Sequence, residues 1–193
     1  FLRVRRPTRV TQSGSSAASE GDKRQVKEQG DTPKAEWVVK KEKFWEKWCE
    51  LKEYKYERIE EDKPGFAFRY YKTEEDRKSG DHSAEIRYSD DANITVKSSG
   101  DTGADYEIWK AIAFQNKGSV IDFSDVKNEF NKAKLYAACL ANGVRPDGVD
   151  VSKLDFTHVF GEIDKSDRKS VQDRLGLDEN GKKINEFTPD ELY

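Results

Sequence analysis

The sequence is poor in the soft metal ligands cysteine, histidine and methionine and in the apolar runs that cross membranes. It contains no methionine, two cysteines and two histidines among its 193 residues. His82 and His158 have no second soft ligand at helical or turn spacing, which argues against a zinc site. No apolar run approaches the roughly 20 residues that a transmembrane helix requires, so we predict no membrane insertion.

The scarcity of cysteine and the absence of methionine bear on the cellular compartment of the chain and on whether it is part of a longer protein. Cys49 and Cys139 lie far apart in predicted helices, so we expect no disulfide and two small, half-buried residues in a reducing compartment. The apolar segment of a signal peptide is also missing from the start of the sequence. A chain without methionine cannot begin at an ordinary start codon, and we therefore expect a piece of a longer protein.

The composition is very polar, with 34% hydrophobic and 38% charged residues. This is too polar for every residue to surround one core, so we predict a compact part with solvated flanks. The predicted divisions are a disordered basic tail or linker at 1–34, an α+β core module at 35–145, and a partly helical, loosely packed extension at 146–193. The net charge of −3 argues against a nucleic-acid surface over the whole chain but leaves a local basic patch open.

The tail prediction depends on how little apolar surface the first residues carry. Phe1–Lys34 has four arginines within its first nine residues and a run of serine, glycine and alanine at 13–19. Such a segment has too few apolar contacts to offset the entropy of ordering it. Its arginines could contact phosphates as a flexible arm. A basic linker is the interpretation that we favour.

A long amphipathic helix is predicted at 35–59, because aromatic and apolar residues recur there at intervals of three and four. In the ordinary interpretation, Trp45 and Trp48 pack on the core or on another part of the parent protein. In the alternative, the tryptophans stack on bases of single-stranded nucleic acid while neighbouring lysines contact the backbone. The candidate residues for binding a partner or nucleic acid are Lys41, Trp45, Trp48, Lys52 and Lys55.

The centre of the chain changes from strand period to helix period, which is the strongest structural signal in the sequence. Strands are predicted near 66–71, 84–88, 93–97 and 119–123, and helices near 106–116 and 125–141. They predict an α+β fold, in which a small, mainly antiparallel sheet is covered on one face by two helices, with an N-terminal amphipathic helix and flexible tails. The predicted core residues are Tyr106, Trp109, Ile112, Phe123, Phe130 and Leu135.

No stretch carries a complete catalytic or cofactor motif. The glycines in 98–103 lack the lysine and hydroxyl of a phosphate-binding loop. Asp122 and Asp125 follow a strand, where carboxylates often hold a divalent ion, but a helix cap explains them better. His82 has no nucleophile placed beside it by the sequence. We therefore predict no catalytic residue, no metal site and no cofactor.

Residues 86–144 resemble a known accessory module. The pieces that carry the resemblance are the hairpin Ile86–Val96, the helix with Ile108–Ala113, the step Val120–Ser124, and the helix from Glu129 that closes at Asn142-Gly143. Together they resemble the seventh type of large polyvalent protein-associated domain. That family occurs in conjugative relaxases and mobilisation proteins, conjugative primases and phage polyvalent proteins. The chain differs in its short link Lys117-Gly118-Ser119 and in its polar hairpin loop.

The resemblance implies an accessory domain of a DNA-processing protein, with no catalytic residues of its own. The first hypothesis is a non-catalytic module in the bacterial cytoplasm that binds protein components of a conjugative transfer or secretion apparatus. Such a module could also act as a type IV secretion translocation signal and enter a recipient cell. The second hypothesis is a single-stranded DNA-binding module that uses the tryptophan- and lysine-rich helix. A small hydrolase or nuclease with an acid-coordinated metal is the third.

Overall fold

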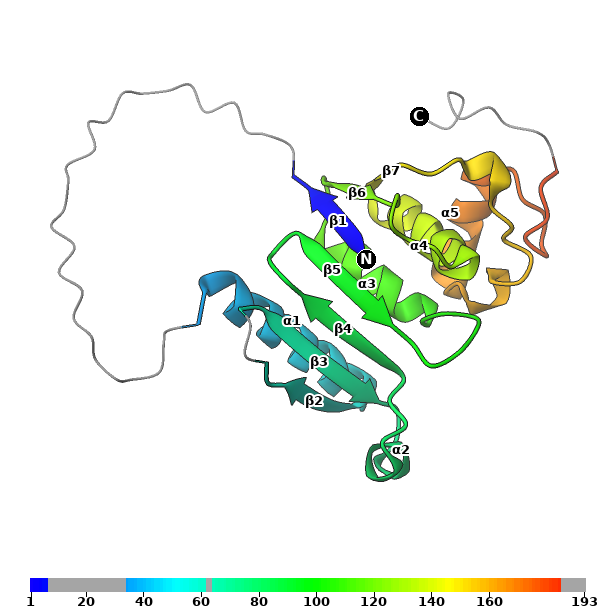
Figure 1. The fold of residues 1–193 in the computed structure, drawn as a ribbon. Helices are drawn as coiled ribbons and strands as arrows, with labels where there is room; N and C mark the ends of the chain where they lie inside the picture. The colour runs from blue at the N-terminus through cyan, green and yellow to red at the C-terminus, as the bar shows by residue number, and fades with distance from the viewer. Residues whose placement is uncertain (7–33, 62–63, 185–193) are drawn as a thin grey trace, which may run out of the picture.

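The fold is drawn in Figure 1 from a computed structural model that describes residues 1–6, 34–61 and 64–184. The strands are β1 (Leu2–Arg5), β2 (Lys55–Ile59), β3 (Phe66–Tyr71), β4 (Ala84–Tyr88), β5 (Asn93–Lys97), β6 (Val120–Asp122) and β7 (Arg145–Asp147). The α-helices are α1 (Glu36–Lys52), α2 (Glu74–Ser79), α3 (Tyr106–Gln115), α4 (Glu129–Asn142) and α5 (Lys165–Leu175). Two short 3-10 helices, η1 (Val151–Lys153) and η2 (Phe160–Glu162), precede α5.

The seven strands form one sheet in the order β2-β3-β4-β5-β1-β6-β7. Neighbouring strands are antiparallel except β6 and β7, which run parallel with α4 between them in sequence. The predicted α+β fold with a mainly antiparallel sheet is therefore confirmed, and the four predicted strands correspond to β3, β4, β5 and β6. The sheet is larger than predicted because the sequence pattern did not reveal β1, β2 and β7.

Alternation along the strands gives the sheet one apolar face and one charged face. On β3, Phe68 and Tyr70 face α1, and the ring centroid of Phe68 lies 4.9 Å from that of Trp45. Arg69, between them, points to the other face, where its Nε donates to Glu85 on β4 at 2.9 Å. The charged face of the sheet is therefore held by ion pairs, and the helices gather on the apolar face.

Helices α1 and α3 cover the apolar face of the sheet and lie behind the strands in Figure 1. Helix α3 places Trp109 beside Leu2 of β1 and Val96 of β5. Helix α4 packs against α3 and β7, and α5 packs against α4. The predicted pair of covering helices corresponds to α3 and α4, but α1 also covers the sheet.

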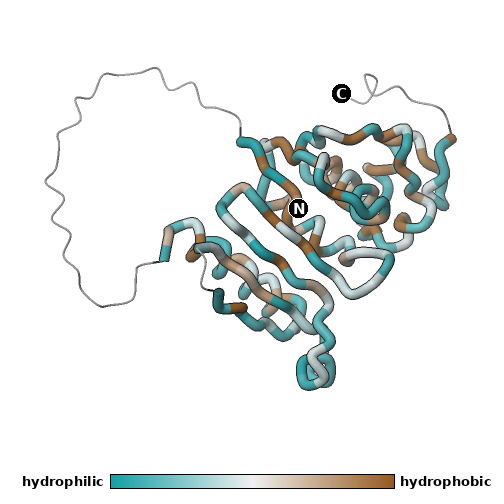
Figure 2. The backbone as a smooth tube through the Cα atoms, viewed as in Figure 1, coloured by the Kyte–Doolittle hydropathy of each residue, from teal (hydrophilic) through white to brown (hydrophobic). Residues whose placement is uncertain are grey.

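Buried apolar residues from β1 to the residues just after α5 form one hydrophobic core. Figure 2 shows hydrophobic residues recurring along the central strands and the helices, whereas the outlying segment that contains α2 is hydrophilic. Five of the six predicted core residues are buried, namely Tyr106, Trp109, Ile112, Phe123 and Leu135, and Phe130 is partly buried. The core was therefore largely predictable from periodicity.

The N-terminal strand corrects one prediction. A disordered tail was predicted at 1–34, but β1 lies in the middle of the sheet, between β5 and β6. Leu2 and Val4 are buried, and the two arginines that alternate with them are exposed. Two apolar residues in a polar, arginine-rich segment are too weak a pattern to identify a strand, because neighbours distant in sequence provide their burial. Residues 7–33 of that prediction lie outside the described residues.

The predicted helix at 35–59 is also too long. Helix α1 ends at Lys52, and Glu53 then adopts a left-handed conformation with φ of 58°. The following residues form β2, which pairs with β3 along its whole length. Tyr56 stacks on Phe68, with ring centroids 5.3 Å apart. The helical spacing of apolar residues continues in the sequence beyond the end of α1, but pairing with β3 makes these residues a strand.

The C-terminal segment is packed more tightly than predicted. A partly helical, loosely packed extension was predicted at 146–193, and α5 confirms its helical part. Phe156, Val159 and Val171 are nevertheless buried in the core, and β7 extends the sheet. The apolar residues are spread over short turns, so no periodic pattern predicts their burial. Residues 185–193 lie outside the described residues.

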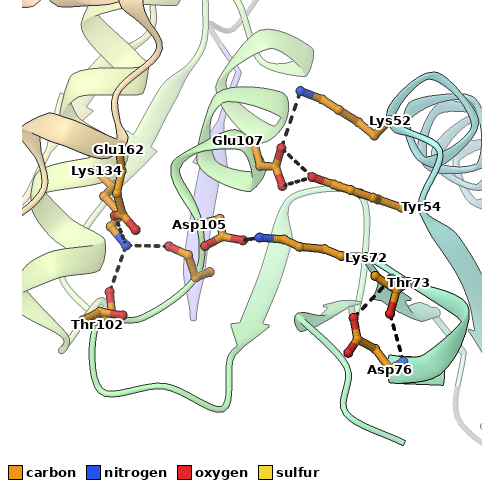
Figure 3. A network of polar contacts seen from close by, with 11 residues as sticks. Lys52, Tyr54, Lys72, Thr73, Asp76, Thr102, Asp105, Glu107, Lys134 and Glu162 are labelled. Atoms are coloured by element: carbon orange, nitrogen blue, oxygen red, sulfur yellow. Dashed lines mark hydrogen bonds and ion pairs between the residues drawn. The ribbon is translucent and has the colours of Figure 1, made fainter. Parts of the chain in front are cut away.

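A buried lysine ties the C-terminal segment to the loop before α3. Lys134 on α4 is fully buried, and its Nζ donates to the carbonyl oxygens of Thr102 and Ala104, each at 3.0 Å. Its Nζ also lies 2.5 Å from Glu162 Oε2 on η2 (Figure 3). A buried ammonium group is tolerated only when its hydrogen-bond donors are satisfied, as these contacts achieve. Lys134 therefore has a structural role.

Candidate functional site

Helix α1 carries two adjoining stripes of large side chains. One stripe, formed by Val38, Trp45 and Cys49, is buried in the core. The other stripe follows spacings of four and three residues, so its members lie along one side of the helix. They are Trp37, Lys41, Phe44, Trp48 and Leu51. The second stripe is only partly covered by the rest of the chain and forms one wall of the candidate site.

Helix α3 runs antiparallel beside α1, and polar contacts mark both ends of the pair. Near the start of α1, Lys41 Nζ lies 3.2 Å from Gln115 Oε1 at the end of α3. Just after α1, the Tyr54 hydroxyl donates to Glu107 near the start of α3 at 2.9 Å. Lys52 Nζ lies 3.5 Å from the same carboxylate (Figure 3). These contacts fix the alignment of the two helices.

A groove with a volume of about 450 Å³ runs between α1 and α3. Its apolar lining consists of Phe44, Trp48 and Leu51 from α1 and of Ala111 and Phe114 from α3. Leu51 is 72% exposed and Phe114 is 53% exposed. Exposed apolar side chains that lie together, with polar residues around them, mark binding surfaces more often than isolated ones do. We call this feature the α1–α3 groove.

The groove continues past Phe44 and Phe114 into a polar hollow, because both side chains also line that hollow. The charged residues there are Arg6, Glu36, Lys40, Lys41 and Asp91. We call this part the polar end of the groove. The α1–α3 groove therefore joins an apolar stretch to a charged one.

Lys41 is the most enclosed charged group at the polar end, with only 7% of the residue exposed. Its Nζ contacts Gln115 Oε1 at 3.2 Å and lies 5.2 Å from the centroid of the Tyr88 ring. Asp91 lies 3.7 Å away, and it also pairs with Arg6 at 2.5 Å. Burial lowers the pKa of Lys41, and the Asp91 charge opposes this effect. The ammonium group of Lys41 is therefore incompletely compensated.

Lys41 predicts a pH-dependent stability that one substitution should remove. Because the pKa of Lys41 is lower in the folded chain than in the unfolded chain, the unfolded state binds more protons between the two values. The free energy of unfolding should therefore rise with pH through the lowered pKa up to about 10.5, the ordinary lysine value. Urea titrations from neutral pH to pH 10.5 would measure this rise.

The Lys41→Met variant should lose the rise in stability, because methionine keeps the apolar stem without the charge. Lys40→Met changes the exposed neighbour on the same helix and should keep the rise. An unchanged pH dependence in Lys41→Met would show that the burial of this ammonium group does not control stability.

The five residues predicted to bind a partner or nucleic acid do not share one free surface. Trp45 is fully buried, and its Nε1 donates to the Tyr88 hydroxyl at 2.9 Å. No base can stack on a ring without an exposed face, so the prediction is wrong for Trp45. Lys41 is also mostly buried, and it contributes to the polar end of the groove instead of an open basic surface.

The other three candidates divide between two surfaces. Trp48 lines the α1–α3 groove and packs edge-on against Trp45, with ring centroids 5.4 Å apart. Lys52 lies at the rim of the same groove. Lys55 belongs to β2, where it pairs with Tyr71 on the charged face of the sheet, because Tyr56 faces the core. The structure therefore brings Lys41, Trp48 and Lys52 to one groove and separates Lys55 from it.

The acidic pair considered for a metal ion has another explanation. Asp122 Oδ1 accepts hydrogen bonds from the backbone N–H and the hydroxyl of Ser124, at 2.9 and 2.6 Å. These bonds lower the pKa of Asp122, and Arg5 lies 3.5 Å away. Over residues 1–6, 34–61 and 64–184, no three histidine, cysteine, aspartate or glutamate side chains are placed to hold a metal ion. Asp122 shapes the turn after β6.

The two cysteines are fully buried, not half-buried as predicted, and neither forms a disulfide. Burial raises the pKa of Cys49 to about 12 and also raises the pKa of Cys139. Because the thiolate is the reactive form of cysteine, neither residue is prepared to act as a nucleophile. Both are packing residues.

The sequence reasoning missed the groove, although a signal was present. Phe114 lies off the buried stripe of α3, and Leu51 lies off the buried stripe of α1. A large apolar residue on the polar side of an amphipathic helix is the signal that could have been used. Two such residues on neighbouring helices become one surface only when the packing of α1 against α3 is known.

The chain was compared with protein-family models, curated proteins and solved structures. No protein-family model, curated protein or solved structure matches the chain. Within the part of the chain that the structure describes, no helix is long and apolar enough to cross a membrane.

Proposed function

We propose that this chain is a non-catalytic accessory module of a conjugative relaxase or mobilisation protein that binds protein components of the transfer machinery. The observation that carries the proposal is the exposure of Leu51 and Phe114 in the α1–α3 groove. The apolar side chains around them offer burial to a partner, and the carboxylates Glu107 and Asp164 of the same lining are paired with lysines. The sequence resemblance of residues 86–144 supports the biological context of the proposal.

A partner that covers the groove gains from the hydrophobic effect. Full burial of a leucine or phenylalanine side chain contributes about 1.5–3 kcal/mol. More than half of Leu51 and of Phe114 is exposed, so most of this gain is still open to a partner. Exposed aromatic and aliphatic side chains in a hollow are also typical centres of protein–protein interfaces. The groove therefore suits protein recognition.

The same surface fits a role as a translocation signal for a type IV secretion channel. A module that is recognised and then transported must present side chains that a receptor can reach in the folded state. The groove presents such side chains on two helices that the core and the contacts at Glu107 and Gln115 hold in place. Recognition then requires little rearrangement of this chain.

The proposal predicts a large effect of charge in the groove on transfer between cells. The full chain is fused to a site-specific recombinase in a conjugative donor, and recombination is scored in the recipient. Leu51→Asp and Phe114→Asp should each lower transfer by about tenfold or more, because each places a carboxylate in the apolar stretch. Western blotting of donors should show equal amounts of every fusion protein.

Ile184→Asp provides the matched control. Ile184 is 65% exposed, so the change is chemically the same, but this side chain does not line the groove. Transfer of the control should equal that of the unmodified fusion. A fusion that stays in the donor would refute the signal role. Equal transfer of the groove variants and the unmodified fusion would remove the groove as the recognised surface.

A further inference from the structure

The α1–α3 groove and its polar end are richer in positive charge than the chain as a whole. Six cationic side chains and four carboxylates line the two hollows, whereas the whole chain has a net charge of −3. The cationic residues are Arg6, Lys40, Lys41, Lys47, Lys52 and Lys110, and the acidic ones are Glu36, Asp91, Glu107 and Asp164. Lys47 and Lys110 also contact Glu50 and Asp167 outside the lining, at 3.0 and 2.9 Å. The polar end, with three cations and two carboxylates, therefore favours a partner that brings negative charge.

The four carboxylates of the groove are already paired with four of its cations. The pairs are Glu36–Lys40, Asp91–Arg6, Glu107–Lys52 and Asp164–Lys110, at 2.5–3.5 Å. Lys41 and Lys47 are the remaining cations, and Lys47 contacts Glu50 at 3.0 Å outside the lining. Lys41 Nζ contacts the neutral Gln115 Oε1 at 3.2 Å, and its nearest carboxylate among the described residues is Asp91, which is 3.7 Å away and shared with Arg6. It is therefore the cation with most to gain from a new carboxylate.

We propose that the groove binds an acidic amphipathic helix of a partner protein. This inference rests on the proposed function and names the partner's chemistry. Apolar side chains of the partner helix pack on Leu51 and Phe114, and one of its carboxylates accepts a hydrogen bond from Lys41 Nζ. A carboxylate that meets an enclosed ammonium group forms a charge-assisted bond, which is stronger than a bond between neutral groups.

The length of the groove sets the spacing in the partner. Lys41 and Leu51 are separated by ten positions of α1, which corresponds to about 15 Å at 1.5 Å per residue. A helix that lies along the groove must therefore carry its carboxylate roughly three turns from its terminal apolar contact. Two antiparallel helices with a hollow between them accept a third helix by the packing that operates inside helical proteins.

Single-stranded nucleic acid fits the groove less well than an acidic helix. Base stacking needs exposed aromatic faces, but Trp45 has none, and Lys117 Nζ lies 4.6 Å from the centroid of the Phe114 ring. The carboxylates Glu107 and Asp164 line the apolar stretch and would repel phosphates. These features favour a protein partner with acidic residues.

Binding of three synthetic peptides to the full chain tests the inference. Each labelled peptide has about 15 residues and a helix-forming sequence. The first has leucines on one face and glutamates beside them, the second has lysine in place of each glutamate, and the third has serine in place of each leucine. Fluorescence anisotropy should show binding of the first peptide and affinities lower by about tenfold or more for the other two.

Three variants of the chain locate the binding site. Lys41→Met should weaken binding of the acidic peptide by about tenfold, whereas Lys169→Met, at an exposed position on α5, should not change it. Leu51→Asp should remove binding. Equal binding of the acidic and basic peptides, or equal binding by Lys41→Met and the unmodified chain, would overturn the inference.

Two further measurements test other occupants. Salt-sensitive binding of an oligothymidylate that Lys41→Met weakens would assign the groove to nucleic acid. Self-association that Leu51→Asp prevents, measured by sedimentation, would assign it to a second copy. Either result overturns the inference. If no peptide binds but Leu51→Asp still lowers transfer, the acidic helix is refuted and the proposed function stands. If peptides bind but the unmodified fusion stays in the donor, the proposed signal role fails instead. If peptides bind and transfer does not depend on Leu51, the groove is not the surface that the transfer machinery recognises.

Discussion

Val4→Asp should prevent cooperative folding of this chain. Val4 is buried in β1, where it pairs with Ile121 of β6 and faces the core. In the strand order, β1 lies between β5 and β6 and pairs with both. An unpaired buried carboxylate destabilises the folded state by several kcal/mol. This cost is comparable to the whole free energy of unfolding of a typical domain, about 5–15 kcal/mol. Circular dichroism during urea titration should show no cooperative transition.

Arg3→Ser is the matched control for Val4→Asp. Arg3 is the neighbouring residue of the same strand, and its side chain is exposed. The substitution should change the free energy of unfolding by about 0.5 kcal/mol or less, as is usual for surface positions. A Val4→Asp variant that unfolds at the same urea concentration as Arg3→Ser would show that β1 does not hold the sheet together.

Trp45→Ala should lower the free energy of unfolding by about 3–5 kcal/mol, the usual cost of truncating a buried tryptophan. Trp45 contacts the rings of Phe44, Trp48 and Phe68, with centroids 4.9–5.4 Å apart. Its loss also leaves the buried hydroxyl of Tyr88 without its hydrogen-bond donor. Urea titration followed by circular dichroism measures the change.

Leu51→Ala is the control for Trp45→Ala, because it truncates an exposed side chain of the same helix, α1. Leu51 is 72% exposed, so its truncation should change stability by about 0.5 kcal/mol or less. This contrast separates the buried stripe of α1 from the stripe that lines the groove. Equal destabilisation by Trp45→Ala and Leu51→Ala would contradict the placement of the two residues.

The middle of the fold could be predicted because its signals are local. Strands β3, β4 and β5 alternate in polarity, and a turn at 89–92 joins the last two. Helix α3 carries its buried residues at helical spacing. Each pattern is complete within a few residues, so the distant parts of the chain need not be known.

The missing parts of the fold depend on distant partners. The apolar residues of β1 become core residues only because β5 and β6 lie on either side. Residues 55–59 continue the helical period of α1, and only the ladder with β3 makes them a strand. The residues of a short stretch of sequence do not indicate which distant residues they will contact.

The candidate site was predicted in part. Of the five candidate binding residues that the sequence predicts, Lys41, Trp48 and Lys52 line the proposed groove. Trp45 lies only three positions before Trp48, yet the first is buried and the second is partly exposed. Spacing places both on one broad side of a helix. Only the position of the sheet decides which of them faces the core.

The place of β1 in the sheet has a consequence for the rate of folding. Strand β1 pairs with β5 across about ninety residues and with β6 across about one hundred and twenty residues. The hairpins β2-β3 and β4-β5 close much shorter loops and can form early. Strand β1 can dock only after β5 and β6 are in place on either side of it, so we expect its docking to be the slow step of folding. Folding of this chain should accordingly be limited by its first strand.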